Sequence, residues 1–133
     1  MAKPLYGKKD GVIILSDNNF TGTKLTSGFK GPGVLKAYAA YCPFCQNKVR
    51  DIKKLAKAFK TENIGLVLYV IEADKNHLFS SATEIEAYPT MMYVDNDGNV
   101  GRLVDQFNQP ASDVPSIIDS LCTTKMKCLK KKK

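Results

Sequence analysis

The feature of this sequence that most constrains its fold is the position of two cysteines, Cys42 and Cys45, between a strand-like and a helix-like segment. Residues 34–40 form a short and nearly continuous apolar run, which is typical of a central strand in a sheet. Residues 43–61 then carry apolar side chains at alternating intervals of four and three, the pattern of one helical face. We therefore expect the cysteine pair at the N-terminus of a helix that follows a buried strand.

Apolar runs and turn residues predict the remaining elements. We expect strands at 11–15 and 64–72, a turn or helix start at 16–20, a hairpin of 90–94 with 99–104, part of a helix within 74–86 and a last helix at 112–121. The glycine-rich stretch 22–33 predicts a loop. It lacks the Lys-Ser/Thr ending of a phosphate-binding loop, so we assign it no nucleotide.

Length and charge predict one domain with a basic tail. The 133 residues fit a polar lead (1–10), one compact domain (11–122) and a disordered tail (123–133). Six lysines in the last nine residues account for nearly all of the net charge of +7. The tail could attract an acidic protein, nucleic acid or an anionic membrane, or it could simply be solvated.

The N-terminal sequence predicts where the protein is located. No apolar segment of signal-peptide length follows its first positive charges, so we expect the protein in the cytoplasm. Its apolar runs are strand-sized, which predicts no membrane span. Because cytosolic thiols are kept reduced, a Cys-x-x-Cys pair there indicates redox catalysis or metal binding more than a structural disulfide.

The spacing of Cys42 and Cys45 suits thiol chemistry. A cysteine at a helix N-terminus lies beside unpaired N–H groups and the positive end of the helix dipole, which favour the nucleophilic thiolate. We therefore expect Cys42 to attack a disulfide and Cys45, one turn further on, to resolve the mixed disulfide. Pro43 suits the first helical position, where a backbone N–H is not needed.

The stretch 34–45, the amphipathic helix after it, the run Tyr88-Pro89-Thr90 and the Asp-Asn-Asp-Gly hairpin together resemble the thioredoxin superfamily. The resemblance covers residues 12–121 and is nearest to thioredoxins and to the catalytic domains of protein disulfide isomerases. It implies an α/β thioredoxin fold, with a central mixed sheet flanked by helices on both faces. It also implies a protein disulfide oxidoreductase that needs no bound cofactor or metal.

The same resemblance implies which residues meet the substrate and which partners are expected. Pro89 matches the family's cis-proline, so that Tyr88 and Thr90 would help to shape a substrate groove. Tyr41, Pro43 and Phe44 would surround the sulfurs. The partners would be proteins with disulfides or thiols, and a reductase, glutathione or a thiol oxidase would exchange electrons with the site.

Two departures from the family pattern leave the redox character open. The centre Cys42-Pro-Phe-Cys45 resembles glutaredoxins, so a glutathione-dependent activity is the nearest alternative. Lys36 stands where the family typically has a buried carboxylate, and strand alternation predicts that its side chain is at least partly enclosed. Its ammonium could tune the sulfurs, reach water or pair with a carboxylate.

Cys122 and Cys128 follow the last expected helix. They could form a second redox pair, close a structural loop or remain free thiols. They could also complete a zinc site with Cys42 and Cys45, although five residues between them exceed the usual spacing. A non-catalytic binding module is a further alternative. The lone His77 is expected at the surface and is given no role.

Overall fold

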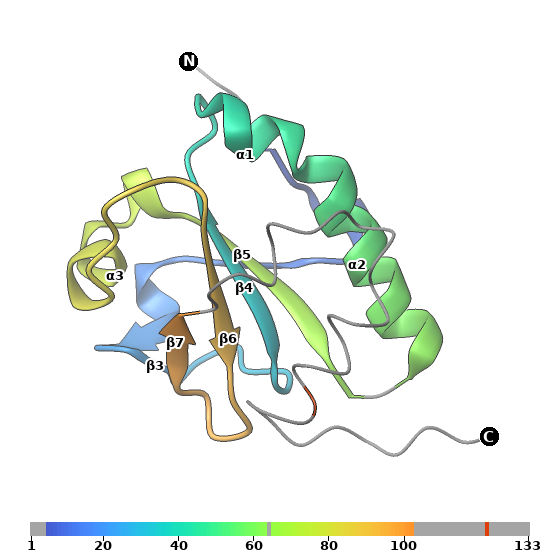
Figure 1. The fold of residues 1–133 in the computed structure, drawn as a ribbon. Helices are drawn as coiled ribbons and strands as arrows, with labels where there is room; N and C mark the ends of the chain where they lie inside the picture. Colours follow the sequence, from blue (N-terminus) through green and yellow to red (C-terminus); the bar gives the residue numbers. More distant parts are fainter. Residues whose placement is uncertain (1–4, 64, 103–121, 123–133) are drawn as a thin grey trace.

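The computed structural model describes residues 5–63, 65–102 and 122, and these residues build a five-stranded mixed sheet (Figure 1). Its strands are β1 (Ile13–Leu15), β4 (Gly33–Tyr38), β5 (Val67–Glu72), β6 (Thr90–Val94) and β7 (Val100–Arg102), in the spatial order β1-β5-β4-β6-β7. Strands β1, β5 and β4 are parallel, whereas β6 and β7 run antiparallel to their neighbours. The mixed sheet predicted from the sequence is thus confirmed.

Strand β4 lies at the centre of the sheet and all six of its residues are buried. Its side chains alternate between the two faces, as in any strand. Val34 and Tyr38 belong to the core on one face, and Leu35 and Ala37 to the core on the other. This alternation places Lys36 on the same face as Val34 and Tyr38, which is the face that the cysteines share.

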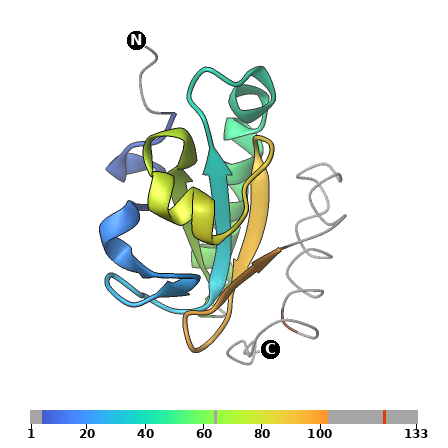
Figure 2. The same ribbon diagram turned by 90° about the vertical axis from the view of Figure 1, so that its left-hand side faces the viewer.

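Helices cover both faces of the sheet, as expected (Figure 2). The helices α1 (Pro43–Asn47) and α2 (Val49–Glu62) pack on one face, with Ile52, Leu55 and Phe59 in its core. The short helix α3 (His77–Ala82) packs on the other face through Phe79. The exposed His77 lies at the surface, as predicted.

Three short 3-10 helices connect these elements: η1 (Lys8–Asp10), η2 (Asp17–Asn19) and η3 (Ala73–Lys75). The Asp17 carboxylate accepts hydrogen bonds from the backbone N–H groups of Leu78 and Phe79, at 3.3 and 2.8 Å. These N–H groups belong to the first turn of α3, where they have no partner within the helix. Asp17 therefore fixes where α3 begins.

The single helix predicted over residues 43–61 is wrong in one respect, because it is interrupted at Lys48. The Cys45 carbonyl accepts hydrogen bonds from the Lys48 backbone N–H at 3.3 Å and from the Lys36 ammonium at 2.9 Å. These bonds occupy the carbonyl that a regular α-helix would offer to residue 49. The periodicity of apolar residues continues across the interruption, which is why the sequence pattern does not reveal it.

The N-terminal lead contributes to the packed body of the protein. The Tyr6 side chain is only 4% exposed and Leu5 packs against the same core. Asp10, at the end of η1, forms an ion pair with Lys53 of α2 at 3.1 Å. The segment 5–10 therefore lies against α2 and the sheet.

A small hairpin that the sequence did not predict, β2 (Phe20–Thr21) with β3 (Lys24–Leu25), joins the end of the stretch 16–20 to the start of the glycine-rich loop. The predicted hairpin of β6 and β7 is present, and the Asp95 carboxylate closes its turn by accepting from the N–H groups of Asp97 and Asn99. The helix predicted at 112–121 and the tail 123–133 lie outside the described residues. No helix in the described part of the chain is long and apolar enough to cross a membrane.

Candidate active site

Cys42 occupies the N-cap position of α1, at the end of the loop that leaves β4. Its Sγ accepts a hydrogen bond from the Cys45 backbone N–H at 3.3 Å. The Gln46 side-chain amide donates to the Ala40 carbonyl at 2.8 Å and so holds the loop to the helix. An N–H group directed at a sulfur stabilises its thiolate form, the form that attacks disulfides. The geometry therefore suits Cys42 as the nucleophile.

Cys45 lies one helical turn behind Cys42 and its side chain is fully buried. Burial, and then contact with the Cys42 sulfur, raises the pKa of the Cys45 thiol from its ordinary value of 9.0 to about 11. Both cysteines are free thiols in this structure. Cys45 is therefore protonated at neutral pH and must lose a proton before it can act as a nucleophile.

Lys36 is fully buried beside Cys45. Its Nζ donates hydrogen bonds to the Tyr6 hydroxyl at 2.7 Å and to the Cys45 carbonyl at 2.9 Å. The ammonium neither reaches water nor appears in any ion pair among the residues described here, so those two alternatives are wrong. Burial lowers the pKa of Lys36 from 10.5 to about 8, although the nearby sulfurs act in the opposite direction.

Tyr6 completes this arrangement, although nothing in the sequence singles it out. Its ring packs edge-on against Tyr38 at 5.4 Å between centroids and lies 5.1 Å from the Lys36 Nζ. Burial raises the pKa of the Tyr6 hydroxyl well above its ordinary value of 10.0. The only signal available was an aromatic residue within a polar lead, which does not by itself indicate a site.

The Tyr88–Pro89 peptide bond is cis, in agreement with the family resemblance. It directly precedes β6, which pairs with β4 in the middle of the sheet. The Cys42 thiol donates a hydrogen bond of 3.5 Å to the Tyr88 carbonyl, so the loop and the nucleophile meet. The Thr90 hydroxyl donates to the Ala87 carbonyl at 2.7 Å and tightens the same loop.

Aromatic side chains surround Cys42. Tyr41 and Phe44 are 62% and 72% exposed, which is unusual for large apolar side chains. Tyr41 packs edge-on against the half-buried Tyr88, with 6.5 Å between ring centroids. Pro43 is exposed between the cysteines. The structure therefore brings the predicted substrate-facing residues together at one end of the sheet.

Of the second cysteine pair, the described residues include Cys122. Cys122 is disulfide-bonded and packs against the core that contains the active-site cysteines. Cys122 is therefore neither a free thiol nor a zinc ligand here, so those two alternatives are wrong for it. Cys128 lies outside the described residues, so whether this pair is redox-active or structural stays a prediction. Within the described residues, no group of three or more histidines, cysteines or carboxylates is placed to hold a metal ion.

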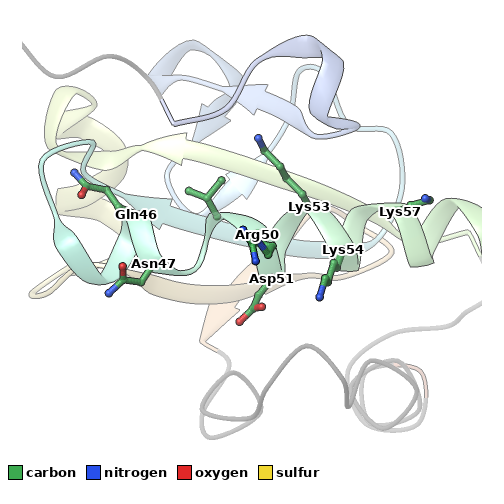
Figure 3. A pocket seen from close by; sticks show the side chains of 8 residues that line it. Gln46, Asn47, Arg50, Asp51, Lys53, Lys54 and Lys57 are labelled. Atoms are coloured by element: carbon green, nitrogen blue, oxygen red, sulfur yellow. The ribbon is translucent and has the colours of Figure 1, made fainter.

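A hollow of about 670 Å³ follows the surface of α1 and α2 (Figure 3). It is lined by Gln46, Asn47, Val49, Arg50, Asp51, Lys53, Lys54 and Lys57. The side chains of Lys53 and Lys54 point to opposite sides of the helix, so they do not converge on one point. We assign this hollow no ligand.

With this geometry in place, the thioredoxin family model matches residues 11–119 of the sequence. The chain belongs to the thioredoxin family. This thioredoxin-family chain is 33% identical over 87 residues to the protein disulfide-isomerase A6 homolog of Drosophila melanogaster, a match that covers 65% of this chain and 19% of the relative. It is 27% identical over 84 residues to protein disulfide-isomerase 1 of Caenorhabditis elegans, covering 63% and 17%.

The chain spans about a fifth of the length of these curated relatives. Solved structures give the same fold. The first thioredoxin domain of mouse protein disulfide-isomerase A4 superposes with a TM-score of 0.68 at 19% identity, covering 87% of this chain and 79% of that domain. The Trx4 domain of ERdj5 gives a TM-score of 0.64 at 18% identity, covering 86% and 97%. This thioredoxin fold is thus established on structural as well as sequence grounds.

Proposed function

We propose that this protein is a thiol–disulfide oxidoreductase that acts on protein disulfides or thiols through Cys42 and Cys45. One observation carries the proposal: the Cys42 sulfur caps α1 and accepts an N–H hydrogen bond from Cys45, whose own thiol is buried one turn behind. Both thiols are free. The hydrogen bond from an N–H group suits Cys42 to the attacking role, and the buried thiol of Cys45 suits the resolving role.

In the reducing direction the reaction has two steps. The Cys42 thiolate attacks one sulfur of the substrate disulfide, forms a mixed disulfide and expels the first substrate sulfur as a thiolate. The Cys45 sulfur, after losing its proton, attacks the Cys42 sulfur and expels the second substrate thiolate. The substrate disulfide has then gained two electrons and the protein holds a Cys42–Cys45 disulfide. Oxidation of a substrate dithiol is the reverse sequence.

Substrate contact is assigned to the exposed aromatic side chains and the loop before β6. Tyr41 and Phe44 offer apolar surface beside Cys42, and the Tyr88 carbonyl lies 3.5 Å from the Cys42 sulfur. An extended peptide that lies along this loop would bring its sulfur to Cys42, with its backbone facing that of Tyr88. We expect substrates with apolar residues next to their cysteine, because exposed aromatic side chains gain most from covering by apolar groups.

Reduction of insulin disulfides with dithiothreitol as electron source tests the proposal. The full chain should accelerate the precipitation of the insulin B chain, and a Cys42→Ser variant should not. Equal rates for the two proteins would contradict the proposal. Replacing dithiothreitol by glutathione, or by a thioredoxin reductase with NADPH, then identifies the electron donor and separates glutaredoxin-like from thioredoxin-like activity.

The basic tail and the location of the protein remain part of this proposal. If the tail only attracts acidic partners, deletion of residues 125–133 should leave the rate of insulin reduction unchanged, because the described site contains none of them. Any acidic partner held by the tail should be released as salt screens the attraction. Cytoplasmic location, expected from the sequence, is tested by cell fractionation.

A further inference from the structure

We propose that Lys36 is the proton acceptor for Cys45 in the resolving step, and that Tyr6 holds the Lys36 amine in place for this task. The inference rests on the proposed function, since it concerns the second step of the same disulfide exchange. It assigns the proton of Cys45 to Lys36, which is held by Tyr6 from the N-terminal segment 5–10.

The geometry places the Lys36 amine against the backbone of Cys45, the residue that must lose a proton. The Nζ lies 2.9 Å from the Cys45 carbonyl and 2.7 Å from the Tyr6 hydroxyl, and no part of the side chain is exposed to water. Both hydrogen-bond partners are uncharged groups. The amine can therefore give up its proton without breaking an ion pair, and two of its N–H groups keep their partners in either protonation state.

The surroundings of Lys36 favour the neutral form of its amine. Cys42 and Cys45 of α1 face it, as do Lys48 and Asp51 at the start of α2, and Tyr6 and Tyr38 lie under its ammonium. Burial dominates these effects and lowers the pKa of Lys36 to about 8. At pH 7 roughly a tenth of the lysine is then neutral, and a general base is most effective when its pKa lies near the working pH.

The first step of the exchange prepares Lys36 for the second. While Cys42 carries a negative charge, that charge favours the ammonium form of Lys36. Formation of the mixed disulfide removes the charge, because the Cys42 sulfur is now bonded to the substrate. Lys36 therefore holds its proton less tightly at the stage at which Cys45 needs a proton acceptor.

In the resolving step Cys45 gives its proton to Lys36 and releases the substrate from Cys42. The Cys45 S–H bond breaks and its proton passes to the neutral Lys36 amine, which becomes an ammonium. The Cys45 sulfur forms a bond with the Cys42 sulfur, and the bond between Cys42 and the substrate sulfur breaks. The substrate leaves as a thiolate with the electron pair of that bond, so the cysteine pair is oxidised and the substrate is reduced. The ammonium later returns its proton to solvent or to the departing thiolate.

Tyr6 is a positioning residue in this scheme. The segment 5–10 is held by the Asp10–Lys53 ion pair at 3.1 Å and by the hydrogen bond of 2.8 Å from the Gly7 N–H to the Asp10 carboxylate. Tyr6 thereby covers Lys36, keeps water away and offers its hydroxyl oxygen to the amine. A lysine left in water would keep its ordinary pKa and would be almost entirely protonated at pH 7.

Stopped-flow reduction of 5,5'-dithiobis(2-nitrobenzoate) tests this proposal, because each step releases one coloured thiolate. Equimolar full-length protein, reduced at Cys42 and Cys45 with the disulfide of Cys122 left intact, should give a first phase from Cys42 and a second, concentration-independent phase from Cys45. In the wild-type protein the second phase should accelerate from pH 6 to about 8 and then level off. In Lys36→Met it should be roughly a hundredfold slower at pH 7, as for loss of a general base, and should keep rising to pH 10.

Lys36→Arg separates proton transfer from charge. A guanidinium keeps the positive charge but does not give up its proton, so this variant should behave like Lys36→Met in the second phase. The exposed Lys57 offers a matched control, and Lys57→Met should leave both phases unchanged. A wild-type pH profile in Lys36→Arg or Lys36→Met would overturn the proposal. Absence of a second thiolate from the wild-type protein would instead overturn the proposed function.

A measurement on the wild-type protein keeps the test independent of how the variants fold. Nitrogen-15 NMR of the Lys36 side chain should show that it titrates at a lower pH in the Cys42–Cys45 disulfide form than in the reduced form. Titration at the same pH in both forms, or above pH 10 in either, would show that Lys36 is not coupled to the cysteines and would overturn the inference.

Discussion

At the scale of single residues, one helical turn separates two buried cysteines that have different surroundings. The Cys42 sulfur caps the N-terminus of α1 and accepts a backbone N–H hydrogen bond, whereas burial penalises the charged form of Cys45. The chemical difference between the two thiols arises from position alone, because the side chains are identical. It decides which sulfur starts an exchange and which one ends it.

Single substitutions should separate these roles. Cys42→Ser should abolish disulfide exchange, because the buried and protonated Cys45 cannot begin it. Cys45→Ser should still attack but should not release the substrate, so mixed disulfides should accumulate. Acid quenching followed by mass spectrometry of the intact protein measures the trapped species. Equal trapping by both variants would show that the roles are reversed or shared.

Tyr6→Phe should destabilise the protein although it removes only one oxygen atom. The Lys36 amine would lose one hydrogen-bond acceptor within the core, and a buried donor left without a partner costs about 1–3 kcal/mol. Urea unfolding at pH 7 measures this change. Tyr41→Phe is the matched control, since the exposed Tyr41 hydroxyl can bond to water, and it should change the free energy of unfolding by less than about 0.5 kcal/mol.

At the scale of secondary-structure elements, the sequence pattern succeeds where one periodicity extends over many residues. The alternation along β4 and the apolar face of α2 follow directly from residues 34–61; β4 contributes to both cores and α2 to the core that contains the cysteines. The break at Lys48 could not be predicted in this way. It depends on a hydrogen bond from Lys36 to the Cys45 carbonyl, which joins a strand to a helix and leaves no periodic trace.

Strand pairing makes a prediction at Gly33, where β4 begins. A Cβ atom at this position would overlap the carbonyl oxygen of Val67 on the paired strand β5. Gly33→Ala should therefore separate the two strands locally and lower the free energy of unfolding by more than about 3 kcal/mol. Gly22→Ala is the matched control, because its Cβ would meet no atom within 4 Å. Its left-handed φ of 61° should cost only about 1–2 kcal/mol. Equal losses in urea unfolding would contradict this account.

At the scale of the whole molecule, the family fold and the cysteine pair could be predicted because each motif that indicates them is a short run of neighbouring residues. The link between Tyr6 and Lys36 joins positions 30 residues apart. A polar lead gives no periodic signal, so the sequence did not indicate that its one aromatic side chain enters the core beside the active site. Long-range contacts of this kind need the folded structure.

The stability of the reduced protein should depend on pH through Lys36 and Cys45. The pKa of Lys36 is about 8 in the folded state and 10.5 ordinarily, so between these values the unfolded chain binds the extra proton. The free energy of unfolding should then rise with pH, by up to about 1.4 kcal/mol per pH unit for one proton.

Cys45 acts in the opposite direction between its ordinary pKa of 9.0 and the folded value of about 11, because the folded state keeps the proton there. The two effects leave a net gain from pH 8 to 9, and above pH 9 the raised pKa values of Cys45 and Tyr6 increasingly offset it. Lys36→Met should lack the gain and should lose stability above pH 9. Urea unfolding of both proteins under a phosphine reductant, at half-unit intervals from pH 7.5 to 10, measures the difference; a wild-type stability that stays level from pH 8 to 9 would mean that Lys36 remains charged within the core.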